Sequence, residues 1–181
     1  MSRYIAFLRA INVGGHTVKM EDLRRLFEGL GLTRVETFIA SGNVVFETAS
    51  RSPRGLEQQI AGRLREALEY EVATFLRTTG ELTEIAQRQP FSPAVLAGAV
   101  ALNVAFLGAP LDAEKQRRLM QLRTPQDEFA VLGREIHWLS RQKQSESKIS
   151  NAVFEKALGQ PSTVRGVATL QKMAAKYGAV G

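Results

Sequence analysis

The first 78 residues alternate between patterns typical of strands and of helices, and this alternation constrains the fold more than any other feature. The order strand, helix, strand, strand, helix, strand is the split βαβ, or ferredoxin-like, pattern. It predicts one four-stranded sheet with both helices packed on one face. Strands are expected at residues 3–9, 34–40, 43–48 and 71–78, and amphipathic helices at 20–30 and 54–69.

The rest of the chain repeats this order only in part. A strand at 100–107, a helix at 112–122 and a hairpin turning at Gly133-Arg134 are expected, but helical periodicity occupies the place of a last strand. The predicted fold class is therefore α+β, with two ferredoxin-like (α-β plait) subdomains built on antiparallel or mixed sheets. They are expected at residues 1–79 and 80–181, the second ending in helices at 149–158 and 164–177.

Composition narrows the class of protein. With 44% hydrophobic and 23% charged residues, the chain can bury a core and is not expected to be disordered. It has no cysteine, which excludes disulfides and thiolate chemistry. The amino terminus enters a strand pattern without a leader-like segment, and no apolar run has the length of a membrane span. A cytoplasmic protein without membrane contact is expected.

Two polar turns of the first subdomain are expected to meet. In a sheet of spatial order 4-1-3-2, the end of the first strand and the turn of the following hairpin share one rim. Glycine amides, a lysine and the amino-terminal end of a helix would there suit a phosphate or carboxylate. The candidate ligand-binding residues at this rim are Asn12, Gly14, Gly15, His16, Lys19, Ser41, Gly42 and Asn43.

Each turn also has a purely structural interpretation. Gly-Gly can simply open a loop into a helix, and Ser-Gly-Asn can close a hairpin, because these residues tolerate a positive φ. Neither segment matches a dinucleotide-binding or P-loop fingerprint. Only the expected convergence of the two turns favours a binding site.

Positive charge is concentrated near the carboxyl terminus. Residues 141–181 hold seven Lys and Arg against two Glu, and so account for +5 of the formal net charge of +6. If residues 164–177 are one helix, then Arg165, Thr169, Lys172 and Lys176 form a single stripe. Such a stripe can bind an anionic small molecule or nucleic acid, and it can equally be a solvated surface.

Signals for catalysis are sparse, and the catalytic residues remain unknown. His16 lies in the Gly-Gly turn, whereas His137 is expected to be a packed or edge-strand histidine. Neither histidine has the spacing of a metal site, and no metal or other cofactor is predicted. Ser41 lacks a nucleophile elbow, which argues against a Ser-His-Asp hydrolase.

Four segments of the chain resemble one known family. The segments are Ala6–Gly15 with Lys19-Met20, Ser41–Phe46, Ser147–Asn151 and Phe154–Lys156. In these motifs the chain is similar to the uncharacterised bacterial family designated domain of unknown function 1697. The resemblance implies two α-β plait subdomains and no established activity, cofactor or partner. The family's last motif is Thr-x-Arg-Asn-x-x-Thr, which corresponds here to Thr163–Gly166 and Thr169. Gly166 stands in place of the Asn, so this chain lacks the side-chain amide that the motif would supply.

Three functions remain open from the sequence. The first is a binding protein for an anionic ligand, either a nucleotide, a phosphometabolite or nucleic acid, at the rim. The second is an enzyme that uses His16 or Lys19 at the same rim. The third is a structural or interaction module whose turns bind nothing. The sequence identifies neither the ligand, nor a reaction, nor the oligomeric state.

Overall fold

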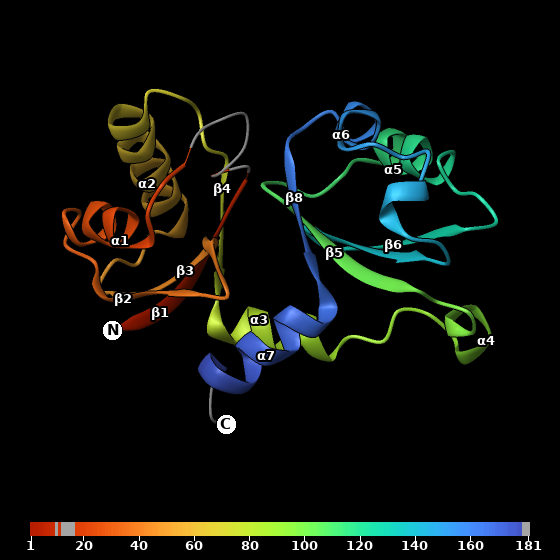
Figure 1. Ribbon diagram of the computed structural model, residues 1–181, viewed down its shortest axis with the longest axis horizontal. Coiled ribbons are helices and arrows are strands. Elements are labelled where there is room, and N and C mark those ends of the chain that lie inside the picture. The colour runs from red at the N-terminus through yellow and green to blue at the C-terminus, as the bar shows by residue number, and fades with distance from the viewer. Residues whose placement is uncertain (10, 12–16, 179–181) are drawn as a thin grey trace. The chain divides into compact units, whose positions relative to one another are not determined.

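The structure of the chain is a computed structural model that describes residues 1–9, 11 and 17–178 (Figure 1). The chain divides into two compact units, each described here by itself. One comprises Met1–Thr83 with Met173–Gly181, and the other comprises Glu84–Lys172. The sequence placed the division after residue 79 and left all later residues in the second subdomain. The structure divides the chain four residues later and groups the residues from Met173 onward with the first unit.

The first unit has the predicted order of elements. Its sheet has the strand order β2-β3-β1-β4, and all neighbouring strands are antiparallel. The predicted order 4-1-3-2 is therefore confirmed. The elements are β1 (Ser2–Leu8), α1 (Met20–Glu28), β2 (Thr33–Phe38), β3 (Ala40–Thr48), α2 (Pro53–Leu68) and β4 (Thr74–Thr78).

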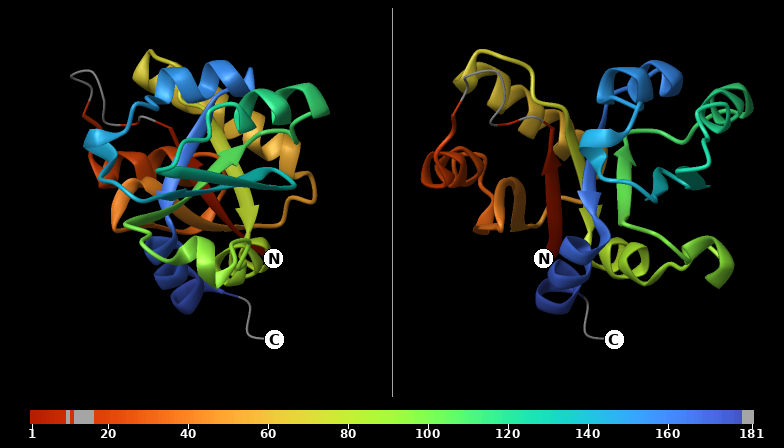
Figure 2. Two further views of the ribbon diagram at one scale, coloured as in Figure 1. Left: turned by 90° about the vertical axis from the view of Figure 1, so that its right-hand side faces the viewer. Right: turned by 45° about the vertical axis from the view of Figure 1, so that its right-hand side comes forward.

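Helices α1 and α2 cover one face of this sheet (Figures 1 and 2). Leu23 and Phe27 of α1 are buried four residues apart, which is the spacing that brings side chains onto one helical face. The α2 helix begins where the Ser52 side chain accepts a hydrogen bond from the Gly55 amide at 3.3 Å. Each fully buried Leu or Phe of this core stabilises the fold by about 1.5–3 kcal/mol.

The second unit repeats the whole order and not only part of it. Its sheet has the strand order β6-β7-β5-β8, again with antiparallel neighbours. Helices α5 and α6 lie side by side on one face (Figure 2). The elements are α3 (Thr79–Gln87), α4 (Pro93–Leu96), β5 (Ala101–Leu107), α5 (Ala113–Met120), β6 (Asp127–Leu132), β7 (Glu135–Ser140), a 3-10 turn (Gln144–Glu146), α6 (Asn151–Leu158), β8 (Ser162–Gly166) and α7 (Val167–Tyr177). Helices α3 and α7 each cross the boundary between the units.

Strand β8 corrects the prediction of a helix over 164–177. Thr163 pairs with Phe106 and Arg165 with Val104, both across an antiparallel ladder to β5. Helix α7 begins only at Val167. The physical reason is tertiary: β5 would otherwise present an unpaired edge, and pairing with it decides the conformation of a short segment whose own pattern is ambiguous.

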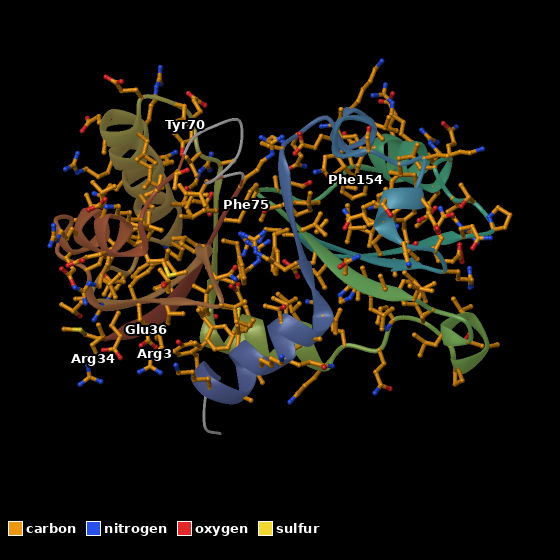
Figure 3. The ribbon with its side chains drawn as sticks, in the orientation of Figure 1. Arg3, Arg34, Glu36, Tyr70, Phe75 and Phe154 are labelled. Atoms are coloured by element: carbon orange, nitrogen blue, oxygen red, sulfur yellow. The ribbon has the colours of Figure 1, made fainter. Side chains whose placement is uncertain are left out.

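An aromatic cluster fills the core of the second unit. The Trp138 ring stacks on Phe154 at 5.1 Å between centroids, and Phe129 lies 5.5 Å from Trp138. The indole N–H of Trp138 donates to Asp127 Oδ1 at 3.0 Å, so the buried carboxylate has a partner. Phe154 brings α6 into this cluster (Figure 3).

The α+β fold class with two four-stranded sheets is thus confirmed. Within the described ranges, no helix combines the length and the apolar character needed to cross a membrane. The same residues contain no group of three His, Asp or Glu side chains that could hold a metal ion.

Candidate functional site

The candidate site lies at one end of the first unit's sheet. Phe7, near the end of β1, pairs with Asn43 of β3, so the end of β1 and the β2–β3 connection lie together. Helix α1 begins after the loop that leaves β1, and α2 ends at Leu68. Because strands and helices alternate in direction along this chain, the start of α1 and the end of α2 belong to the same rim.

The β2–β3 connection differs from its prediction. The chain reverses at Ile39, which has a φ of 64° and is 61% exposed, whereas Ser41–Asn43 lie within β3. The prediction of a turn at Ser41–Asn43 is therefore wrong by a few residues. Strand pairing shifts register after Thr37, and the surplus residues are taken up in β3.

Asn43 has a structural role in this connection. It is 3% exposed, and its Nδ2 donates to the Phe38 carbonyl oxygen at 3.1 Å. This hydrogen bond joins the two strands across the register shift. The bond explains an Asn at this position without any ligand.

The other predicted rim residues are described only in part. Asn12, Gly14, Gly15 and His16 lie outside the described residues, as does the side chain of Ser41. Gly42 is described and lies in β3.

Two hydrogen bonds hold the chain where it leaves β1. The Tyr70 hydroxyl donates to the carbonyl oxygen of Ile11 at 2.6 Å, and the Arg9 amide donates to Ala73 O at 3.0 Å. Burial raises the pKa of Tyr70, so its hydroxyl keeps its proton and remains a donor. Tyr70 lies just beyond the end of α2 (Figure 3), and it therefore ties the β1 exit to the end of that helix.

Lys19 stands immediately before α1. Its backbone is extended, its carbonyl oxygen accepts from the Leu23 amide at 3.0 Å, and its side chain is exposed and does not cap the helix. The ammonium makes no ion pair with the residues that the structure describes. The first amides of α1 have no intrahelical partner and carry the positive end of the helix dipole. Lys19 thus adds a full positive charge beside a partial one.

An open hollow of about 380 Å³ lies beside the first turns of α1. Its charged residues are of both signs, and Arg25 is already held by Glu21 at 2.9 Å, one turn away. The hollow is lined by Thr17, Val18, Asp22, Arg25, Leu26, Ala67 and Leu68. Because Arg25 is engaged by Glu21, the carboxylate of Asp22 is the charge left in the hollow, and Lys19 is a nearby cation without an ion pair among the described residues.

The predicted basic stripe does not exist as one helical face. Arg165 lies on β8, where its Nη1 donates to Thr163 Oγ1 at 2.7 Å and to Val164 O at 3.0 Å. Burial lowers the pKa of Arg165 to about 10. Thr169 and Lys172 do lie on α7, and Lys172 is exposed. The structure therefore separates Arg165 from the helix that was expected to carry it.

Lys176 has aromatic neighbours in place of the expected anion. Its Nζ lies 5.6 Å from the centroid of the Phe38 ring and 5.2 Å from that of Tyr177. Ring faces carry negative electrostatic potential and attract an ammonium. The two rings therefore offset the repulsion expected from Lys172, four residues earlier.

Comparison with known proteins places the chain in a family. The chain belongs to the family described as Protein of unknown function (DUF1697), which matches residues 1–137, and the predicted resemblance is confirmed. No curated protein matches the chain. Among solved structures, the conserved bacterial protein SP0830 from Streptococcus pneumoniae is similar, with a TM-score of 0.74, 23% identity and 98% of each chain covered. This likeness shows the fold alone.

Proposed function

We propose that this chain is a cytoplasmic, non-catalytic binding protein for an anionic small ligand, such as a nucleotide or a phosphometabolite. The ligand would bind at the end of the first sheet, with its anionic group beside Lys19 and the first turn of α1. The observation that carries the proposal is the position of Lys19. Its exposed ammonium has no ion pair among the described residues, and it immediately precedes α1, next in sequence to Val18, which lines the open hollow.

Physical chemistry favours an anion at this position. The unsatisfied amides at the start of a helix point toward incoming groups, and the helix dipole stabilises negative charge there. Glu21 and Asp22 oppose this by placing two carboxylates in the first turn. Arg25 neutralises the charge of Glu21. An anionic ligand would therefore be repelled by Asp22 and attracted by Lys19 and the helix dipole. The balance supports a small anionic group and not a long polyanion.

A structural interpretation competes at this rim. The hydrogen bond from Asn43 to Phe38 explains that part of the rim by folding alone. On this view Lys19 is a solvated surface residue, and no anion stabilises the protein. The two interpretations differ in what a ligand does to the melting temperature.

A thermal-shift experiment separates them. Wild type, Lys19→Ala and the control Lys156→Ala, which removes an exposed lysine of the second unit, are melted with and without inorganic phosphate and adenosine monophosphate. A ligand present at 100 times its Kd stabilises by about 2.7 kcal/mol, which a melting curve resolves. Lys19→Ala should melt like wild type without ligand and lose the ligand-induced rise, while Lys156→Ala keeps it.

Two results would contradict the proposal. One is a wild type that does not respond to either anion at saturating concentration. The other is an equal response of wild type and Lys19→Ala, which would place any anion elsewhere on the chain.

A further inference from the structure

A second cavity lies wholly within the second unit. Its volume is about 270 Å³, and all of its lining residues fall between Arg88 and Gln171. Leu96 and Leu102 contribute apolar surface, while Asn103, His137 and Gln171 contribute polar groups. A single water needs only about 10–15 Å³ of such space, so the cavity has room for a small molecule.

His137 is the unusual residue of this cavity. It lies on β7, between β6 and β5 in the sheet, and is 3% exposed. The sequence predicted a packed or edge-strand histidine; it is packed, but on an interior strand. Its Nε2 is buried and has no hydrogen-bond partner in the described part of the chain. Buried polar atoms are nearly always paired, and an unpaired one costs stability.

The cavity is electrically balanced. Arg88 Nη1 lies 2.7 Å from the buried carboxylate of Glu135, and Arg88 also lies 3.6 Å from Glu84. The pKa of His137 is lowered to about 4, mainly by burial and to a smaller extent by the positive charge of Arg88. The negative charge of Glu135 acts in the opposite direction. The imidazole is therefore neutral at neutral pH. No net positive charge is left to attract an anion.

The polar groups define what could fill the space. The neutral imidazole Nε2 can make one hydrogen bond, and the carboxamides of Asn103 and Gln171 each offer a donor beside an acceptor. Phe91 also lines the cavity and, with the two leucines, can pack against a flat ring. Ligand cavities are typically apolar with a few convergent polar groups of this kind.

We infer that this cavity is a binding site for an uncharged planar heterocycle that carries adjacent hydrogen-bond donors and acceptors, as the nucleobases do. Such a ligand would pair with the Nε2 of His137 and the amides of Asn103 and Gln171 and would pack on the apolar wall. This site is separate from the rim of the first unit, and it can be present whether or not an anion binds there.

Nuclear magnetic resonance of the histidine side chains tests the inference. The chain has two histidines, so ¹⁵N-labelled wild type and a His16→Gln variant assign the imidazole resonances. Uracil, cytosine, adenine and hypoxanthine are titrated separately to millimolar concentration at neutral pH. At least one should shift the Nε2 resonance of His137 saturably and leave that of His16 unchanged.

Variants then locate the binding by calorimetry. Gln171 is exposed, so Gln171→Ala should fold normally and weaken binding roughly fivefold through the loss of one hydrogen bond. Gln126→Ala, another exposed glutamine of this unit outside the cavity lining, is the matched control and should not change the affinity. His137→Leu should abolish binding.

Three results would overturn the inference. The first is that none of the four heterocycles shifts the His137 resonance. The second is unchanged affinity in both Gln171→Ala and His137→Leu, which would place the heterocycle elsewhere. The third is binding of uridine monophosphate much tighter than that of uracil, which would contradict the choice of an uncharged ligand.

Discussion

Burial of a neutral His137 predicts a specific loss of stability in acid. The pKa of this imidazole is lowered from its ordinary value of 6.5 to about 4 in the folded protein, chiefly by burial. Between these values the unfolded chain binds a proton that the folded protein does not, so stability falls as the pH is lowered through this window. Well below the lower value both states are protonated, and the loss is complete.

The magnitude follows from the two pKa values. At about pH 5 the unfolded imidazole is almost fully protonated, whereas the folded one is about one-tenth protonated. The difference lowers the free energy of unfolding by about 2 kcal/mol relative to about pH 7. Carboxylates that titrate in the same range add their own contributions, which a variant without His137 retains.

The assay is urea unfolding of wild type and His137→Leu at both pH values. The wild type should lose about 2 kcal/mol more than the variant on acidification. At neutral pH the variant also removes an unpaired buried nitrogen, but that effect is constant with pH and cancels in the comparison. Parallel stability curves for wild type and His137→Leu would refute the buried, neutral imidazole.

Three further predictions concern stability alone. Trp138→Phe removes the hydrogen bond to Oδ1 of the buried Asp127, whose Oδ2 keeps its bond from Thr124, and should lower the free energy of unfolding by about 1–3 kcal/mol, measured by circular dichroism in urea; an unchanged midpoint would contradict a stabilising role for the indole hydrogen bond. Gly62→Ala, within α2 with no atom near the added methyl, should raise the stability by about 0.5–1 kcal/mol. Gly159→Ala, at a φ of +66°, should lower the free energy of unfolding by about 1 kcal/mol. If both alanine variants changed the stability in the same direction, the helical conformation at Gly62 or the left-handed one at Gly159 would be contradicted.

The first unit and the hairpin of the second unit could be predicted because their local patterns agree with their tertiary structure. In the first unit, Leu23 and Phe27 repeat at helical spacing. In the second unit, Gly133-Arg134 lies at the turn between β6 and β7, as expected. Strand β8 could not be predicted in this way. Val164 is the only large apolar residue between Ser162 and Gly166, and the segment is extended because β5 offers it a pairing edge.

The sites were harder to predict because they depend on contacts distant in sequence. Glycine and asparagine at 42 and 43 suggested the turn, yet the chain reverses at Ile39, a residue that rarely adopts a positive φ. The strand pattern around His137 predicted a packed or edge-strand histidine, and the residue is packed. The cavity beside it is also lined by Arg88 and Gln171, which lie 49 and 34 residues away along the chain. No local sequence pattern predicts that such distant residues line one cavity.

The division of the chain has a consequence for how it is made on the ribosome. The first unit contains residues from the beginning of the chain and again from Met173, and Tyr177 near the end of α7 contacts Phe38 of β2 at 5.6 Å between ring centroids. The second unit is one continuous segment. During synthesis, therefore, the unit that is translated later is the first whose residues are all present, and the earlier one must wait for its final helical turns. Until then Phe38 lacks its aromatic partner, and that incomplete surface is what a chaperone would encounter.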